Sequence, residues 1–272
     1  AHNNFFEEVA KFRASRALWA EIVRDQFKAN SPKSWLLRFH TQTGGSTLAA
    51  QEPDNNVVRV TLQALAAVLG GTQSLHTNGK DEALALPTQD SAKLALRTQQ
   101  IIAYESGVAD TADPLGGSYF VERLTADLAA AARAIMIEVD KRGGAVAAIE
   151  SGWMQEQIAD SAYRAQGRIE SGESIVVGVN KYVDPTAQAQ AVEVHRIDPA
   201  LEREQRASLA AFRAHRDSTI AAQRLASLKH AAQSSAPLMP EFIEAADAGC
   251  TLGEMSDALR EVFSVHHPAA RV

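Results

Sequence analysis

Residues 70–87 read GGTQSLHTNGKDEALALP, and they concentrate hydrogen-bonding side chains between two hydrophobic helical patterns. The segment TQSLHTN is typical of a short strand, and further polar residues follow it directly. In a parallel barrel the loops after the strands build the binding face, so these side chains are expected to meet at one mouth. Alternatively, Asn78 and Asp81 only cap helices and satisfy turns. The residues themselves leave both interpretations open.

A second polar junction of the same kind, HTQTGGS at residues 40–46, lies upstream. SWLLRFHTQ predicts a strand from about 35 to 42. The pattern NNVVRVTLQALAAVL predicts a helix that ends at Gly70 and Gly71, and another helix is expected over 88–106, closed by Gly107. The order helix, strand, helix, strand, helix predicts an α/β fold with a parallel sheet, because parallel strands need crossover connections.

The remainder of the sequence is mostly helical. Apolar periodicity predicts helices over about 4–27, 118–141, 145–150, 154–171 and 199–229, with Asn4 and Glu7 spaced as a capping pair. IVVGVNKYV predicts a strand or extended segment. We expect residues 1–183 to form the first domain, 184–198 a linker and 199–272 a helical carboxyl-terminal extension. In the final helical unit Thr251 and Glu254 have capping-box spacing.

Composition excludes several classes of partner. The formal net charge of −6 provides no basic patch for nucleic acid or an anionic membrane, and no apolar run is long enough for a transmembrane helix. Cys250 is the only cysteine, so we expect neither a disulfide nor a CxxC pair, and a cytoplasmic location. His40 and His76 lack the neighbours of a metal-ligand cluster, and no metal site is expected. The absence of an initiator Met suggests the middle of a longer chain.

Five segments carry a resemblance to a known family: HTQTGGSTLAAQ, NNVVR, LGGTQSLHTNGKDEALALPT, RTQQIIAYESGVADTADPLGGSYFVE and IVVGVNKYV. They closely resemble the carboxyl-terminal half of the large (alpha) subunit of the methylmalonyl-CoA mutase family of adenosylcobalamin-dependent acyl-CoA mutases. The resemblance implies the carboxyl-terminal part of a (β/α)8 TIM barrel, about strands seven and eight with their helices, followed by a mostly helical extension. It also implies a radical carbon-skeleton isomerisation, with interconversion of methylmalonyl-CoA and succinyl-CoA as the first expectation.

Site residues follow from the same resemblance. Those expected at the adenosylcobalamin cofactor, with its cobalt, are Gln42, Gly45, Asn78, Glu82, Ala83 and Leu86. Of these, Asn78 and Glu82 are candidates for holding the adenosyl ribose or the corrin amides. Gln73 and Ser74 are expected to face the barrel interior and to hydrogen-bond along the acyl-CoA substrate. The catalytic residues of the family are expected upstream of residue 1, so no catalytic residue is assigned.

The sequence departs from the family pattern in one respect that concerns partners. It has no Asp-x-His motif, whose histidine supplies the lower axial ligand of cobalt in the family. That ligand is therefore expected from a separate small cobalamin-binding subunit or domain. The helical region after the linker would be an arm toward this partner or, in the milder interpretation, a peripheral cap.

Two further functions remain open alongside the leading one. The chain could be a non-catalytic truncated module that binds the cobalamin subunit. It could also be a sibling mutase that acts on isobutyryl-, 2-hydroxyisobutyryl- or ethylmalonyl-CoA. In every case two strands with open edges and a bare core favour association, so we expect an oligomer rather than a stable monomer.

Overall fold

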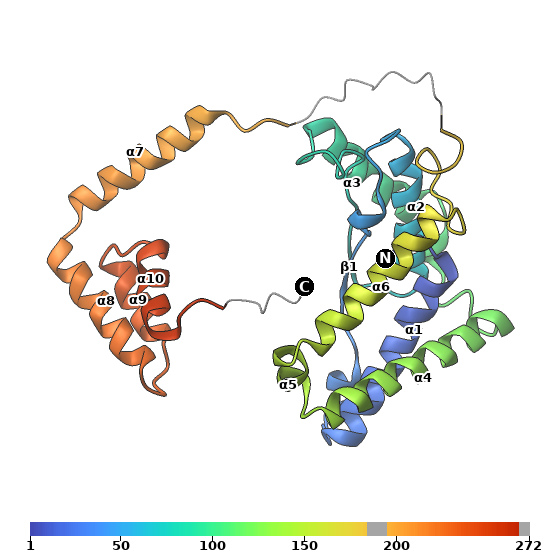
Figure 1. Ribbon diagram of the computed structural model, residues 1–272, viewed down its shortest axis with the longest axis horizontal. Helices are drawn as coiled ribbons and strands as arrows, with labels where there is room; N and C mark the ends of the chain where they lie inside the picture. Colours follow the sequence, from blue (N-terminus) through green and yellow to red (C-terminus); the bar gives the residue numbers. More distant parts are fainter. Residues whose placement is uncertain (184–194, 267–272) are drawn as a thin grey trace. The chain divides into compact units, whose positions relative to one another are not determined.

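The computed structural model describes residues 1–183 and 195–266, and the chain divides into two compact units, Ala1–His195 and Arg196–Val272 (Figure 1). Most of the linker predicted over 184–198 lies outside the described residues, so the domain boundaries stay predictions. No helix within the described ranges is both long and apolar enough to cross a bilayer. Each unit is described by itself below.

The sheet of the first unit has two parallel strands, β1 (His40–Gln42) and β2 (Ser74–His76). His40 is paired with Ser74 and Gln42 with His76, and α2 (Asn55–Leu69) forms the crossover between the strands. The predicted parallel α/β arrangement is therefore confirmed, in a unit that is mostly helical. Closure of these strands into a barrel stays a prediction.

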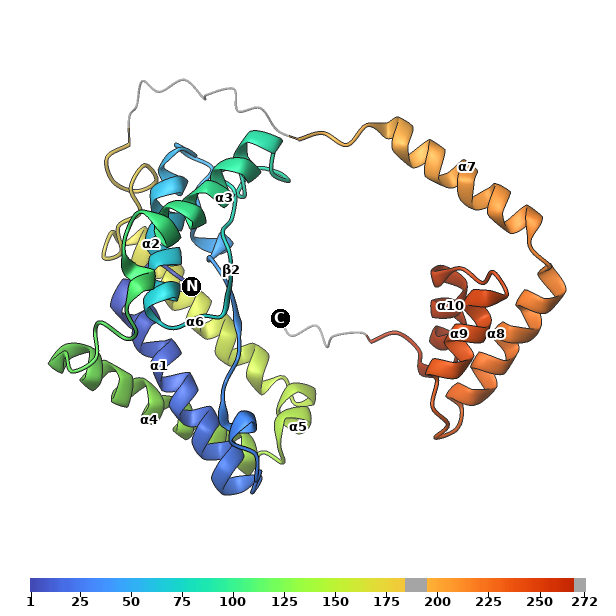
Figure 2. The same ribbon diagram turned by 180° about the vertical axis from the view of Figure 1, so that it is seen from behind.

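The rest of the first unit is mostly helical. Its further helices are α1 (Phe5–Glu21, continued by a π-helix at Ile22–Gln26), α3 (Gln89–Tyr104), α4 (Tyr119–Lys141), α5 (Ala145–Glu150) and α6 (Trp153–Glu170), with 3-10 turns at Pro32–Trp35, Gly45–Thr47 and Val108–Asp110. Figure 2 shows α1 and α4 side by side, and α1 also packs on α2. Their contact buries Val9, Ala66 and Val121 in one cluster. Arg13 of α1 forms ion pairs with Asp113 and Glu122, which fix the start of α4 against α1.

Two local predictions near the amino end are wrong. The predicted strand over 35–42 begins only at His40, because Pro32 starts a 3-10 turn and the Trp35 indole donates to the Ala29 carbonyl at 2.9 Å. Asn4 precedes α1 without capping it, since its side-chain amide donates to the Glu7 carboxylate instead of accepting a backbone N–H.

The predicted strand or extended segment at IVVGVNKYV is a turn with a single bridge between Val177 and Lys181. The Asn180 side chain organises it. Its Oδ1 accepts from the Val176 N–H at 2.7 Å, and its Nδ2 donates to the Ile169 and Ser174 carbonyls at 2.8 Å. A side chain that satisfies so many local backbone groups competes with a strand ladder, which explains the difference.

The second unit consists of α7 (Pro199–His215), α8 (Ser218–Ala232), α9 (Met239–Asp247) and α10 (Leu252–Phe263). The continuous helix predicted over 199–229 is wrong, because the chain leaves the helix at Arg216 and Asp217. The Asp217 carboxylate accepts the N–H groups of Thr219 and Ile220 and so caps a new helix. Helix α8 packs against both α9 and α10.

The core of this unit contains Ala221, Ala245 and Cys250. The capping box of Thr251 and Glu254 is confirmed.

Candidate functional site

One face of the two-stranded sheet is polar and exposed. Side chains alternate along a strand, so Thr41 is buried while His40 and Gln42 point to the opposite face together with their register partners Ser74 and His76. His40 Nδ1 lies 2.8 Å from Ser74 Oγ, which joins the two strands through their side chains. The sheet therefore presents a row of hydrogen-bonding groups instead of an apolar surface.

Four of the residues predicted at the cofactor meet where the two strands end. Gln42 Nε2 donates to Asn78 Oδ1 at 3.0 Å, although the two residues lie 36 positions apart in the chain. A Cβ atom at Gly45 would lie 2.7 Å from Asn78 Nδ2 and 3.2 Å from Glu82 Oε1. The loops after β1 and β2 thus touch through Gln42, Gly45, Asn78 and Glu82.

Asn78 is the buried centre of this group. Its side chain is 2% exposed, and its Nδ2 has no hydrogen-bond acceptor within the described part of the chain. A buried donor without an acceptor costs about 1–3 kcal/mol, so such groups are uncommon and call for an explanation. Glu82, which lies beside it, is exposed. Together they offer one N–H donor and one carboxylate acceptor to a polar ligand.

The loop after β2 is held against α3 by Asp81. Its carboxylate accepts the Thr88 N–H at 2.9 Å and the Ser91 hydroxyl at 2.6 Å, and the side chain is almost completely buried. A Cβ atom at Gly79 would lie 2.5 Å from Asp81 Oδ1, so only glycine fits there. For Asp81 the interpretation as a turn-stabilising group is therefore confirmed, whereas Asn78 caps no helix.

Comparison with known proteins identifies the family of this chain. The family model described as methylmalonyl-CoA mutase matches residues 1–265. The chain belongs to the methylmalonyl-CoA mutase family. It is 48% identical to the 2-hydroxyisobutanoyl-CoA mutase large subunit of Aquincola tertiaricarbonis, over 98% of this chain and 47% of that protein.

Two methylmalonyl-CoA mutases are similarly related. The Escherichia coli (strain K12) protein is 46% identical over 96% of this chain and 36% of its own length. The mitochondrial protein of Homo sapiens is 44% identical over 97% of this chain and 35% of its own length. The chain thus spans between about a third and a half of the length of these curated relatives.

Sequence reasoning missed two buried polar side chains on α2. Gln63 accepts the Gly44 N–H at 3.0 Å and donates to Thr47 Oγ1 at 2.6 Å, so it fixes the loop after β1. Asn56 hydrogen-bonds the loops after both strands. The available signal was their position, since Asn56, Val60 and Gln63 share the buried stripe of α2.

The other predicted site residues take different positions. Ala83 and Leu86 lie exposed on the turn that follows Asn78, and Leu86 is 59% exposed. Gln73 already uses its amide locally, because its Oε1 accepts the Phe39 N–H at 2.7 Å and its Nε2 donates to the Gly71 carbonyl at 2.8 Å. Ser74 bonds His40. Roles for these residues along a ligand stay predictions.

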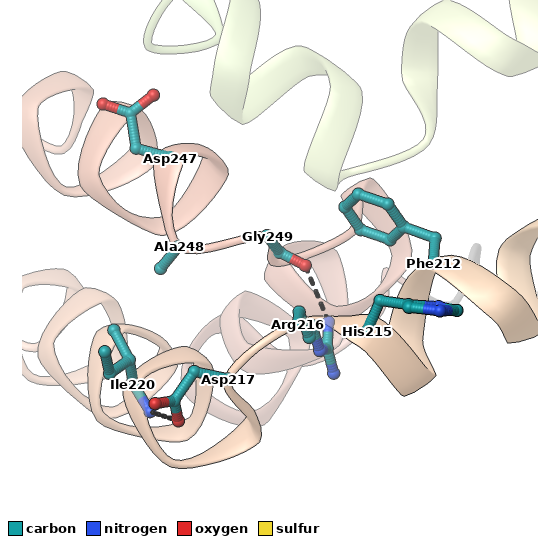
Figure 3. A pocket seen from close by; sticks show the side chains of 8 residues that line it. All are labelled: Phe212, His215, Arg216, Asp217, Ile220, Asp247, Ala248 and Gly249. Carbon is teal, nitrogen blue, oxygen red and sulfur yellow. Dashed lines mark hydrogen bonds between the residues drawn. The ribbon is translucent and has the colours of Figure 1, made fainter.

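Two cavities lie away from the strand ends. One of about 470 Å³ lies between α4 and α6 and is mainly apolar, with Trp153 and Ile158 among its walls. The other, of about 440 Å³, lies in the second unit (Figure 3), lined by Phe212, His215, Arg216, Asp217, Ile220, Asp247, Ala248 and Gly249.

Two of the charged groups around the second cavity, Arg216 and Asp217, already have partners within the protein. Arg216 donates to the Gly249 carbonyl and forms a double hydrogen bond with Glu254, while Asp217 caps α8. The hydrogen bonds from Arg216 lower the pKa of Glu254 to about 2. This ion pair therefore stabilises the junction of α7, α8 and α10 and neutralises the charge of Arg216.

Proposed function

We propose that this chain provides the strand-end cofactor face of an adenosylcobalamin-dependent acyl-CoA mutase, acting first of all on methylmalonyl-CoA and succinyl-CoA. The observation that carries the proposal is the meeting of Gln42, Gly45, Asn78 and Glu82 around a buried amide N–H without an acceptor. Membership of the methylmalonyl-CoA mutase family supports the reaction class. In this proposal the two strands are the seventh and eighth of a (β/α)8 barrel.

The residues present fit the chemical groups of this cofactor. The amide side chains of a corrin and the ribose hydroxyls of the adenosyl group are acceptors for Asn78 Nδ2, and the same groups are donors for the Glu82 carboxylate. Glycine at position 45 leaves room for the Asn78 amide and the Glu82 carboxylate, so that both can take part in holding the cofactor. The exposed Ala83 and Leu86 would contact its apolar rim.

The role of this chain in catalysis would be binding and shielding. When bound, adenosylcobalamin supplies the radical chemistry through homolysis of its cobalt–carbon bond. Asn78 and Glu82 hold and orient the group, and the polar row of His40, Ser74 and their neighbours offers hydrogen bonds to the amides of an acyl-CoA. Close packing of both loops keeps water away from reactive species. A protein ligand to the cobalt would come from a separate subunit or domain.

The proposal also includes a protein partner and a substrate class. The Aquincola relative is named as a large subunit, which supports a separate small cobalamin-binding subunit here. Its name also denotes a 2-hydroxyisobutanoyl-CoA mutase, and its 48% identity makes that substrate class the second candidate. The lone Cys250 supports a cytoplasmic location. A non-catalytic module that only binds the cobalamin subunit is the third candidate.

The proposal is tested with the mutase assembled from the subunit that contains this chain and its cobalamin-binding partner. Each candidate acyl-CoA is incubated with enzyme and adenosylcobalamin, and the isomer formed is measured by mass spectrometry. Conversion of methylmalonyl-CoA to succinyl-CoA supports the leading substrate. If only 2-hydroxyisobutyryl-CoA is converted, that compound is the substrate instead. Cofactor binding without conversion of any acyl-CoA would favour the non-catalytic module.

A further inference from the structure

Asn56, on α2, is a fully buried amide that hydrogen-bonds the loops after both strands. Its Oδ1 accepts the Ala49 N–H at 3.1 Å, and its Nδ2 donates to the Ala49 carbonyl at 2.8 Å. The same Nδ2 donates to the Lys80 carbonyl at 2.9 Å. Ala49 lies in the loop after β1 and Lys80 in the loop after β2, so one side chain connects the two.

These are the loops whose contact forms the proposed cofactor face. Gly45 precedes Ala49 in the first loop, and Asn78 and Glu82 lie on either side of Lys80 in the second. Asn56 itself is 0% exposed, and its side-chain oxygen and nitrogen already bond protein groups, so no polar atom of it is left for a bound ligand. Any influence on the cofactor must therefore act through the position of the loops.

Other contacts also join the loops, but in different places, among them the hydrogen bond from Gln42 to Asn78. Thr43 Oγ1 accepts the Asn78 N–H at the end of the strands, and Lys80 forms an exposed ion pair with Asp54 at the outer side. An exposed ion pair contributes little. Asn56 supplies the buried hydrogen bonds between these two places, where the loops would otherwise be free to separate.

Asparagine is the side chain that these partners require. Its carboxamide has an acceptor for the Ala49 N–H and donors for two carbonyl groups, and Arg59 also donates to its Oδ1 at 2.8 Å. An aspartate would direct a carboxylate oxygen at carbonyl oxygens, and an alanine would leave buried backbone groups without partners.

We propose that Asn56 is a positioning residue that sets the spacing of Gly45 on one loop from Asn78 and Glu82 on the other, and thereby the affinity for adenosylcobalamin. This inference rests on the proposed function. It predicts that Asn56→Ala in the assembled mutase weakens adenosylcobalamin binding by about tenfold, the value of roughly one hydrogen bond lost at the cofactor.

The matched control is Asn55→Ala. Asn55 is the neighbouring residue on the same helix, and its side chain donates to Glu52 outside the two loops' contact. We expect this variant to bind adenosylcobalamin within about twofold of the wild type. Equilibrium titration followed by the absorbance of the cofactor gives the dissociation constants, and thermal unfolding of each variant reports whether it is folded.

A double-mutant cycle separates positioning from general destabilisation. If Asn56 acts through Asn78, then Asn56→Ala weakens binding less than about twofold when Asn78→Ala is already present, because the positioned contact is absent. Equal weakening in both backgrounds overturns the inference. Should Asn56→Ala fail to fold, Asn56→Ser, whose hydroxyl is too short to bond both loops but adds no buried charge, is carried through the same cycle.

The outcomes also distinguish this inference from the proposed function. A wild-type mutase that binds no adenosylcobalamin overturns the proposed function and, with it, the role of Asn56. Binding by the wild type together with unchanged affinity in Asn56→Ala overturns the inference alone.

Discussion

Gly45→Ala is the smallest change that perturbs the contact between the two strand-end loops. The backbone at Gly45 is not in the left-handed region, so alanine is allowed there conformationally and the effect is purely steric. The added Cβ would stand 2.7 Å from Asn78 Nδ2, where ordinary contacts begin at 3.4 Å. The Asn78 amide must therefore move by about 0.7 Å, which follows from these two distances.

The cost can be worked from what this movement disrupts. Gln42 Nε2 and Asn78 Oδ1 are 3.0 Å apart, and the displacement would stretch or break this hydrogen bond, at about 1 kcal/mol. Overpacking adds about 1–3 kcal/mol, while replacing glycine by alanine returns about 0.5 kcal/mol by restricting the unfolded chain. We expect a net cost of about 2 kcal/mol. The Glu82 carboxylate, 3.2 Å away, is exposed and can yield.

Amide hydrogen exchange of residues 77–88 in the assembled mutase measures this effect locally. A cost of about 2 kcal/mol corresponds to exchange about 30-fold faster when exchange follows local opening. Ser46→Ala, at the exposed neighbouring position, is the matched control and should leave exchange unchanged. In an Asn78→Ala background the obstructing amide is absent, so adding Gly45→Ala should then change the exchange rate little. Unchanged exchange, or an equal cost in both backgrounds, would refute the reasoning.

Three further predictions concern other parts of the chain. Glu254→Gln should destabilise the second unit by about 1–2 kcal/mol at pH 7. This is less than the full pKa shift of Glu254 would give, because its side chain is 22% exposed and solvent screens the ion pair. Because the folded pKa of about 2 lies below the ordinary 4.5, this stabilisation is present above pH 4.5 and lost as the pH falls through about 2. The labelling rate of the buried Cys250 by a pyridyl disulfide should therefore rise about tenfold at pH 7 in this variant, and should match the wild type near pH 2. Asp81→Ala should leave the Ser91 hydroxyl without its acceptor and lower the free energy of unfolding by about 1–3 kcal/mol. The measurement is the melting temperature, which should fall. An unchanged melting temperature would show that other contacts hold the loop. The 272-residue chain by itself should sediment as an associated species, because Tyr119 and many other large apolar side chains are exposed, and sharp cooperative unfolding of a monomer would contradict this.

The sequence predicts those parts of the fold that depend on local signals. Helix α2 occupies 55–69 as expected, because its apolar period ends at two glycines and Gly71 takes a positive φ of 85°. The start of α4 and both ends of α5 are also close to the prediction. The strand expected from residue 35 was wrong because the contact of the Trp35 indole with a backbone carbonyl carries no sequence periodicity.

The candidate site shows the same limit of sequence reasoning. Polar residues after two strands predict a binding face, but not which of them bond one another. The residue pattern alone did not separate Asn78 from Asp81, and only the family resemblance favoured Asn78. The structure distinguishes an unpartnered amide from a carboxylate engaged by α3. Asn56 was not predicted as a site residue because one of its partners, Lys80, lies 24 positions away in the sequence.

The most direct test of the account is equilibrium titration of adenosylcobalamin into the assembled mutase carrying Asn78→Ala or Glu82→Ala. Glu105→Ala, at an exposed glutamate after α3, is the control for loss of a surface charge. The account predicts that each of the first two changes weakens cofactor binding by about tenfold, as expected for one hydrogen bond to a charged or buried group, while the control does not. Affinity equal to that of the wild type in both variants would contradict the claim that these strand-end loops hold the cofactor.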